Sequence, residues 1–314
     1  MKLSIVLPCY NEAENIPRIH KRLTEMLDGL GCEGEILFVD DGSRDDSVAV
    51  LAEICRRDPR VRVLEFSRNF GHQAAICAGL DHAMGDAVVT LDADLQHPPE
   101  LIPEMVARWQ EGYEIVYTVR QDPPELPRLK RWTSRGFYRL INLVVREKIP
   151  ENAADFRLMD RKVVAEFRRM PERTKFLRGL VSWMGFRQYA LPYQAAQRNA
   201  GRPKYNLWKM IRFALDGITS FSAFPLHVAT FFGILVSFLS FLYGLYVIGI
   251  KLFTHQAVPG WASVMVAVLF LGGVQLICLG IIGGYLNRVF IEVKHRPTYV
   301  IRSIHGFPMA GGES

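Results

Sequence analysis

The first 120 residues alternate between two hydrophobic patterns. Between the short apolar runs, apolar residues recur at helical spacing over Glu14–Leu27, Ser47–Cys55, Gln73–Met84 and Pro99–Trp109. The apolar runs, typical of buried strands, lie at Leu3–Leu7, Glu35–Val39, Val61–Phe66, Ala87–Leu91 and Glu114–Val119. This alternation predicts an α/β domain in which helices cover both faces of a mostly parallel sheet.

A different pattern begins after Asp216. No Asp, Glu, Lys or Arg occurs between Asp216 and Lys251, and none occurs between Lys251 and Arg288. Each interval is longer than the about 20 residues that a helix needs to cross a bilayer. We expect two membrane spans, at Val228–Ile250 and Trp261–Leu286, with two buried core helices as the alternative.

Charged residues around these spans predict their orientation. Lys and Arg gather on the outer flanks, whereas the connecting loop holds only Lys251. By the positive-inside rule, the N-terminal domain and both termini lie in the cytoplasm. The N-terminal run MKLSIVLPCYNE contains too few consecutive apolar residues for a signal peptide and is typical of a strand. The expected location is therefore the inner membrane, as a multi-pass protein.

Two basic amphipathic stretches lie before the first span. Residues 127–146 carry six cations and no acid, and residues 205–222 open with a similar pattern. Helices of this kind lie in the lipid headgroup layer, although a surface helix of purely structural role is the alternative for each. The expected organisation is a domain over 1–204 that includes the first stretch, an interfacial helix over 205–222, two spans within 228–286 and a cytoplasmic tail over 287–314.

Composition adds little to this organisation. The 314-residue chain has a net charge of +6 and five scattered cysteines without a CxxC pair, so neither a disulfide framework nor a structural zinc site is indicated. A reducing compartment is the default. The cations gather beside the spans and no nucleic-acid recognition motif appears, so nucleic acid is not an expected partner.

The candidate chemistry lies where the predicted strands end. The chain lacks GxGxxG and GxxxxGK, so neither common nucleotide motif explains these ends. Their shared feature is carboxylate, in Glu12, Asp40, Asp41, Asp92 and Asp94. A carboxylate cluster suits a divalent cation, Mg²⁺ or Mn²⁺, that bridges to a phosphorylated ligand. Asp94 and Gln96, two apart on a segment expected to be extended, would share the ion; a solvated strand end is the alternative.

Several segments together carry a resemblance to a known family. These are LPCYNEAENI, FVDDGSRDDS, SRNFGHQAA, GDAVVTLDADLQHPPELIP, DFRLMDR and the two closing spans. In this order and spacing they resemble the family-2 glycosyltransferases of the GT-A fold. Within that family they are most similar to polyprenyl-phosphate glycosyltransferases, namely dolichol-phosphate mannose synthase and the bactoprenol glucosyltransferases. The resemblance runs from about Leu3 to Arg302.

The resemblance implies a role for each matching residue. The nucleotide-sugar would be held by Pro8, Tyr10, Glu12, Asp41, Asp92, Arg202 and Lys204. The metal motif would be Asp92, Asp94 and Gln96, and the acceptor phosphate would be held by Arg120, Arg131 and Ser134. Asp94 and Asp155 would be the catalytic carboxylates. Relatives commonly read Gly-Asp-Phe and Ser-Lys-Tyr where this chain has Ala154-Asp155-Phe156 and Pro203-Lys204-Tyr205; Pro203 removes a hydroxyl and an N–H that could have touched phosphate.

The implied reaction is transfer of a hexose to polyprenyl phosphate with inversion. A phosphate monoester is already ionised at neutral pH, so Asp155 is expected to orient acceptor or sugar, with general base as its lesser role. UDP-glucose and undecaprenyl phosphate are the first choice, and the product would be a donor for cell-envelope glycan modification. Another donor such as GDP-mannose or a modified UDP-pentose, and a non-catalytic scaffold with a vestigial nucleotide site, are the alternatives. A homo-oligomer is left open. A processive polysaccharide synthase is disfavoured, because Arg128 stands where its Gln-x-x-Arg-Trp motif needs glutamine.

Overall fold

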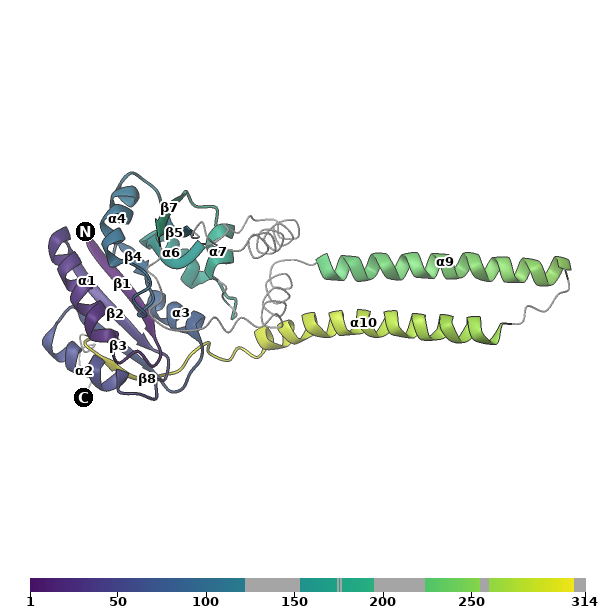
Figure 1. Cartoon of the computed structure of the whole chain (residues 1–314), viewed down its shortest axis with the longest axis horizontal. Coiled ribbons are helices and arrows are strands. Elements are labelled where there is room, and N and C mark those ends of the chain that lie inside the picture. The colour runs from purple at the N-terminus through teal and green to yellow at the C-terminus, as the bar shows by residue number, and fades with distance from the viewer. Residues whose placement is uncertain (122–152, 174, 176, 195–223, 255–259, 308–314) are drawn as a thin grey trace. The chain divides into compact units, whose positions relative to one another are not determined.

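The computed structural model describes residues 1–121, 153–173, 175, 177–194, 224–254 and 260–307. The chain divides into two compact units. The first comprises Met1–Tyr138, Glu147–Pro203 and Arg296–Ser314, and the second comprises Arg139–Arg146 and Lys204–His295. The first unit thus contains both the N-terminal strand and β8 (Ile301–His305), the last strand along the chain in the described residues (Figure 1).

A single eight-stranded sheet forms the centre of the first unit, in the order β7-β5-β6-β4-β1-β2-β3-β8. Only β6 and β8 run against the other strands, so the sheet is mostly parallel, as the sequence predicts. The strands are β1 (Lys2–Cys9), β2 (Glu33–Asp40), β3 (Val61–Phe66), β4 (Ala87–Thr90), β5 (Ile115–Gln121), β6 (Ala153–Asp160), β7 (Gln188–Gln194) and β8 (Ile301–His305).

Helices pack on both faces of this sheet. Leu3, Ile5 and Leu7 of β1 belong to one core cluster with the apolar face of α1. On the opposite face, Val6 lies directly against Gly79 of α3. The helices are α1 (Ile16–Leu30), α2 (Ser47–Arg57), α3 (His72–His82), α4 (Ile102–Gln110), α6 (Arg161–Arg169) and α7 (Leu177–Trp183), with a 3-10 turn η1 (Pro99–Leu101) before α4.

The sequence explains why α1 forms and where it ends. Ile16, Ile19, Leu23 and Leu27 are buried at the i, i+3, i+4 spacing of one helix face. Proline in the first turn is compatible with a helix start, because the amide it lacks would have no partner inside the helix. Gly31 ends the helix at φ 59°, in the left-handed region that glycine adopts readily.

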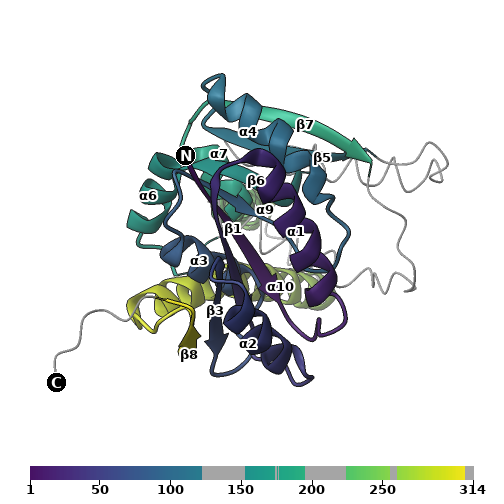
Figure 2. The same cartoon turned by 90° about the vertical axis from the view of Figure 1, so that its left-hand side faces the viewer.

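The C-terminal strand β8 differs from the expected tail. Residues 287–314 were expected to form a cytoplasmic tail, and the N-terminal domain was expected to end at 204. Instead, β8 pairs antiparallel with β3 and becomes the last strand of the sheet (Figure 2). The physical reason is that the outer edge of β3 has free backbone donors and acceptors, and β8 supplies their partners.

The second unit contains two long apolar helices, α9 (Phe224–Thr254) and α10 (Trp261–Val293). Both are long and apolar enough to cross a membrane, over Phe224–Tyr246 and Val266–Val293. Figure 1 shows them running side by side in opposite directions. The predicted basic stretches at 127–146 and 205–222 lie outside the described residues.

Candidate active site

A cavity of about 460 Å³ opens at the edge of the sheet where β1, β2 and β4 end. The carboxyl ends of neighbouring parallel strands meet at this edge, which is where open α/β sheets bind ligands. The structure brings together six of the predicted site residues here, namely Pro8, Tyr10, Glu12, Asp41, Asp92 and Asp94. The lining is completed by Cys9, Asn69, Gly71, His72, Ala75 and Ala93.

Asp41 binds the loop that forms one wall of the cavity. Its Oδ1 accepts a hydrogen bond from the Phe70 amide at 2.7 Å, and its Oδ2 accepts one from the Gly71 amide at 3.0 Å. Burial raises the pKa of the Asp41 carboxyl, and the two amide hydrogen bonds oppose that rise. Gly42 permits the close approach of this loop, since a Cβ there would lie 2.5 Å from the Arg68 carbonyl carbon. Asp41 therefore fixes the position of the loop after β3.

A second group of polar side chains follows β4. Asp92, Asp94 and His97 present ligand atoms that all lie within 4.8 Å of one another. The buried Nδ1 of His97 lies 3.6 Å from Asp92 Oδ2 and has no hydrogen-bond partner among the described residues. Burial raises the pKa of Asp92, and the neighbouring Asp94 and Asp155 add to this effect, against the opposing influence of His72 and His97. Two close carboxylates and an unpartnered imidazole nitrogen fit a divalent cation.

The expected geometry of Asp94 and Gln96 is wrong in one respect. The segment is not extended, because Leu95 has a φ of 62° and the Gln96 amide donates to Asp94 Oδ1 at 3.0 Å. The turn places His97 beside Asp92, and its ring packs near Phe156 and Tyr193. The assignment of Gln96 as a metal ligand stays a prediction.

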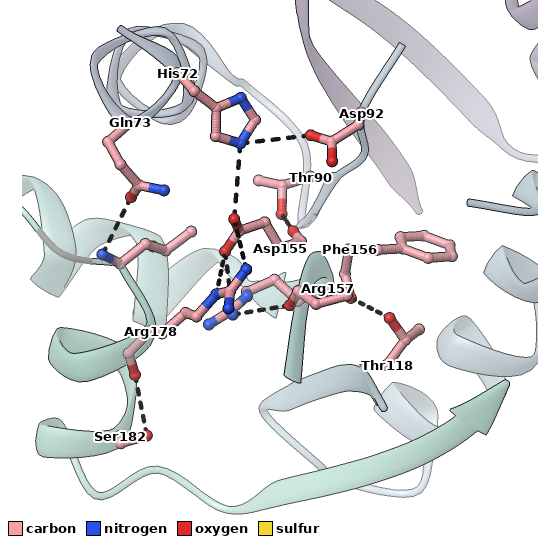
Figure 3. A network of polar contacts seen from close by, with 12 residues as sticks. His72, Gln73, Thr90, Asp92, Thr118, Asp155, Phe156, Arg157, Arg178 and Ser182 are labelled. Atoms are coloured by element: carbon pink, nitrogen blue, oxygen red, sulfur yellow. Dashed lines mark hydrogen bonds and ion pairs between the residues drawn. The ribbon is translucent and has the colours of Figure 1, made fainter. Parts of the chain in front are cut away.

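The largely buried Asp155 carboxylate is surrounded by the basic side chains of Arg157, Arg178 and His72 (Figure 3). Arg178 of α7 donates from Nε to Asp155 Oδ1 at 2.8 Å and from Nη2 to Oδ2 at 3.0 Å. Arg157, which is almost completely buried, lies 3.7 Å from the same carboxylate. Burial opposes ionisation of Asp155, but the nearby His72 imidazole, the hydrogen bonds from Arg178 and the charge of Arg157 outweigh it and hold the pKa far below its usual range. A carboxylate so stabilised in its charged form is a weak base.

His72 connects this network with the acidic cluster. Its Nε2 lies 3.5 Å from Asp92 Oδ1 and 3.7 Å from Asp155 Oδ2, and Figure 3 shows the ring between the two carboxylates. Burial lowers the pKa of His72, but Asp155 and Asp92 raise it by more, so the net shift is upward. His72 therefore takes up a proton more readily than a free histidine, in a cavity whose charged lining residues are the acids Glu12, Asp41, Asp92 and Asp94.

The predicted basic residues are only partly described. Arg120 is exposed near the carboxyl end of β5, and its backbone pairs with Tyr193 of β7. Arg131, Ser134, Arg202 and Lys204 lie outside the described residues. Their assignment to acceptor phosphate and nucleotide stays a prediction.

Three residues of the site were not singled out from the sequence: His72, His97 and Arg178. His72 and His97 stand inside the quoted segments SRNFGHQAA and LDADLQHPPE, so their positions next to strand ends were a usable signal. Arg178 gave no such signal, because it reaches Asp155 from a helix 23 residues further along the chain.

Comparison with known proteins shows the family to which the chain belongs. The model of glycosyl transferase family 2 matches residues 4–168. The bactoprenol glucosyl transferase of Shigella phage SfII is 46% identical over 305 residues, which cover 97% of this chain and 99% of that protein. The uncharacterized glycosyltransferase YkcC of Bacillus subtilis is 47% identical over 306 residues, or 98% of this chain and 95% of that protein.

A solved structure also resembles the chain, more distantly. Mannosyl-3-phosphoglycerate synthase from Rubrobacter xylanophilus aligns with a TM-score of 0.48 and 18% identity, over 70% of this chain and 73% of that one. The family assignment itself comes from the two sequence findings, which span more than half of the chain and nearly all of it, respectively. The chain therefore belongs to glycosyl transferase family 2 and is a glycosyltransferase.

Proposed function

We propose that this chain is a membrane-bound, inverting glycosyltransferase that moves a hexose from a nucleotide-sugar to polyprenyl phosphate. The first-choice substrates are UDP-glucose and undecaprenyl phosphate, because two relatives that are 46% identical, each aligned over 99% of its length, bear the name bactoprenol glucosyl transferase. The observation that carries the proposal is the cluster of Asp92, Asp94 and His97 beside a cavity of about 460 Å³.

The cavity is proposed to hold the donor. Pro8, Tyr10, Glu12 and Asp41 would surround the nucleoside, and Asp92 would face the diphosphate through a cation. Tyr10 is 40% exposed and lines the cavity, so its ring is available to a base. Arg202 and Lys204 are proposed to close on the diphosphate, whose charge guanidinium and ammonium groups recognise.

Asp92, Asp94 and His97 are proposed to hold a divalent cation, with Gln96 as a further ligand. Such an ion, Mg²⁺ or Mn²⁺, would neutralise the charge that develops on the leaving diphosphate. An imidazole ligand favours Mn²⁺ over Mg²⁺, which prefers oxygen. The raised pKa of Asp92, caused first by burial and then by the neighbouring Asp94 and Asp155, supports this assignment, because a bound cation would offset both effects.

The acceptor phosphate is proposed to bind Arg120, Arg131 and Ser134. A phosphate monoester is largely ionised at neutral pH and attacks without a general base. The ion pair with Arg178 supports an orienting role for Asp155, since its carboxylate stays charged and fixed in place. Attack from the face opposite the leaving group would give a β-linked product from an α-linked donor.

The two apolar helices α9 and α10 are proposed to span the inner membrane, with the catalytic unit and both termini in the cytoplasm. Their length and composition support spanning. A lipid-linked acceptor needs an enzyme at the membrane surface, and the basic stretches at 127–146 and 205–222 would lie in the headgroup layer.

A transfer assay tests the proposal. Purified full-length protein is incubated with undecaprenyl phosphate, Mn²⁺ and a panel of labelled UDP- and GDP-sugars, with EDTA in parallel. We expect metal-dependent label in the lipid fraction with UDP-glucose, and proton NMR of that product should show a β linkage. Label from another donor would show that glucose is the wrong sugar. An α linkage would contradict the inverting mechanism, and the absence of label from every donor would contradict the proposed reaction.

A further inference from the structure

After α10 the chain continues into the first unit, where an aromatic side chain, Tyr299, packs against β3 and α3. The Tyr299 ring stacks on Phe66 at the end of β3, with centroids 5.1 Å apart and planes 10° apart. Its hydroxyl donates a hydrogen bond to Asp81 Oδ2 of α3 at 2.9 Å. Tyr299 thus contacts both elements that flank the loop between β3 and α3.

The residues that follow Tyr299 hold the first residue of that loop. The Ser67 amide donates to the Val300 carbonyl at 2.9 Å, and the Ser67 carbonyl accepts from Arg302 Nη2 at 2.9 Å. Arg302 Nη1 also contacts Glu65 Oε1 at 3.0 Å. Both backbone polar groups of Ser67 are therefore engaged by residues 300–302.

The other end of the loop forms the wall of the donor cavity. The Phe70 and Gly71 amides bind Asp41, and Asn69, Gly71 and His72 line the cavity. The Phe70 ring meets Phe66 edge to face at 5.7 Å. Phe66 is fully buried, with Tyr299 and Phe70 both packed against its ring.

We infer that residues 299–302, which we call the C-terminal strap, position the donor-binding loop Ser67–Gly71, so that affinity for the nucleoside diphosphate depends on Tyr299 and Arg302. The inference rests on the proposed function for the identity of the ligand. Tyr299 and Arg302 are positioning residues, because they reach the cavity only through the loop.

Protection of a sheet edge is the simpler role for this segment, and it explains β8 itself. It does not explain Tyr299, which precedes β8 and contacts the ring of buried Phe66 and the Asp81 carboxylate of α3 instead of the backbone edge of β3. The two roles differ in consequence: edge protection affects folding and solubility, whereas positioning affects ligand affinity in the folded protein.

The first test measures UDP binding to full-length protein by calorimetry in the presence of Mn²⁺. Tyr299→Ala is expected to weaken UDP binding about fivefold, with kcat at saturating donor nearly unchanged. Tyr299→Phe keeps the ring stack and is expected to restore most of the affinity. Ile304→Ala, at a half-exposed position of the adjoining strand β8, is the matched control and should bind UDP as the wild type does.

Val106→Ala in α4 controls for a general loss of stability, because it removes buried apolar volume from another helix. If Tyr299→Ala binds UDP like the wild type, or no more weakly than an equally destabilised Val106→Ala protein, the positioning role is overturned. Failure of the wild type itself to bind UDP would instead contradict the proposed donor.

Hydrogen exchange supplies a readout that needs no ligand. In Tyr299→Ala, the amides of Phe70 and Gly71 are expected to exchange faster than in the wild type, because the loop loses its support. In Val106→Ala they are expected to keep their protection. Unchanged exchange at both amides in Tyr299→Ala would overturn the inference whatever the donor is.

Discussion

Arg178 holds the carboxylate of Asp155 with two parallel hydrogen bonds, from Nε to Oδ1 at 2.8 Å and from Nη2 to Oδ2 at 3.0 Å. This arrangement keeps Asp155 charged and fixed at the start of β6, where the antiparallel strand reaches the same sheet edge as the ends of β1 and β4. The pair makes Asp155 a stabilising group as well as a candidate site residue.

Asp155→Asn should destabilise the first unit by about 3 kcal/mol at pH 7, because it removes the negative charge beside the buried guanidinium of Arg157 and the partly exposed guanidinium of Arg178. The native pKa of Asp155 is depressed, so its contribution is present above the unfolded pKa of about 3.9 and is lost as the pH falls below it. Urea unfolding across this pH range should show the difference between wild type and variant shrinking toward low pH. Asp28→Asn is the control, because Asp28 is exposed and paired only at the surface; an equal loss in both variants would refute the assignment.

Mn²⁺ should raise the melting temperature of the wild type, because a cation relieves the repulsion between Asp92 and Asp94 and binds only the folded site. Asp94→Asn should abolish this shift without lowering the melting temperature of the metal-free protein, since it removes one of two crowded charges. Thermal unfolding with and without Mn²⁺ measures both effects. If Mn²⁺ raised the melting temperature of Asp94→Asn as much as that of the wild type, the ion would have to bind at another site.

His97→Phe should keep the packing against Phe156 and Tyr193 but weaken Mn²⁺ binding by about tenfold, because the ring loses the nitrogen that faces Asp92. Metal titration followed by electron paramagnetic resonance measures the change directly. His82→Phe, whose ring lies at the end of α3 beside Phe307, is the matched control and should bind Mn²⁺ normally. Unaltered Mn²⁺ affinity in His97→Phe would contradict a role of His97 in metal binding and leave it only a role in packing.

Arg120→Gln should raise the KM for the lipid phosphate about tenfold while leaving the KM for the nucleotide-sugar nearly unchanged, because a hydrogen bond to a charged group is lost only on the acceptor side. Steady-state kinetics with each substrate varied in turn separates the two constants. Arg108→Gln, at an exposed arginine paired with Glu111, serves as the control. An equal rise in both KM values in Arg120→Gln would assign Arg120 to the donor instead.

The sequence predicted the parallel centre of the sheet well. The expected strands at Leu3–Leu7 and Ala87–Leu91 correspond to β1 and β4, and the cavity gathers the carboxylates expected at their ends. These strands are buried on both faces, so they appear as continuous apolar runs that periodicity detects. The two long apolar helices were equally predictable, because each corresponds to an interval without charged residues that is longer than an ordinary core helix.

The antiparallel strands were not predictable in this way. β8 alternates between half-buried and exposed residues and includes Arg302, Ser303 and His305, so its apolar signal is weak. Its position is determined by the open edge of β3, more than 230 residues earlier in the chain. The Asp155–Arg178 pair was not predictable either, because it is a tertiary contact that no local pattern encodes. The position of His97 depends on the turn at Leu95, which the sequence did not indicate.

The most direct test of the account is the mass spectrum of undecaprenyl phosphate after incubation with UDP-glucose, Mn²⁺ and the full-length protein. We predict that the lipid gains the mass of one hexosyl residue with the wild type, and that it is unchanged with EDTA or with Asp94→Asn. An unmodified lipid with the wild type, under conditions in which UDP binds, would contradict polyprenyl phosphate as the acceptor. Full modification by Asp94→Asn would contradict the site.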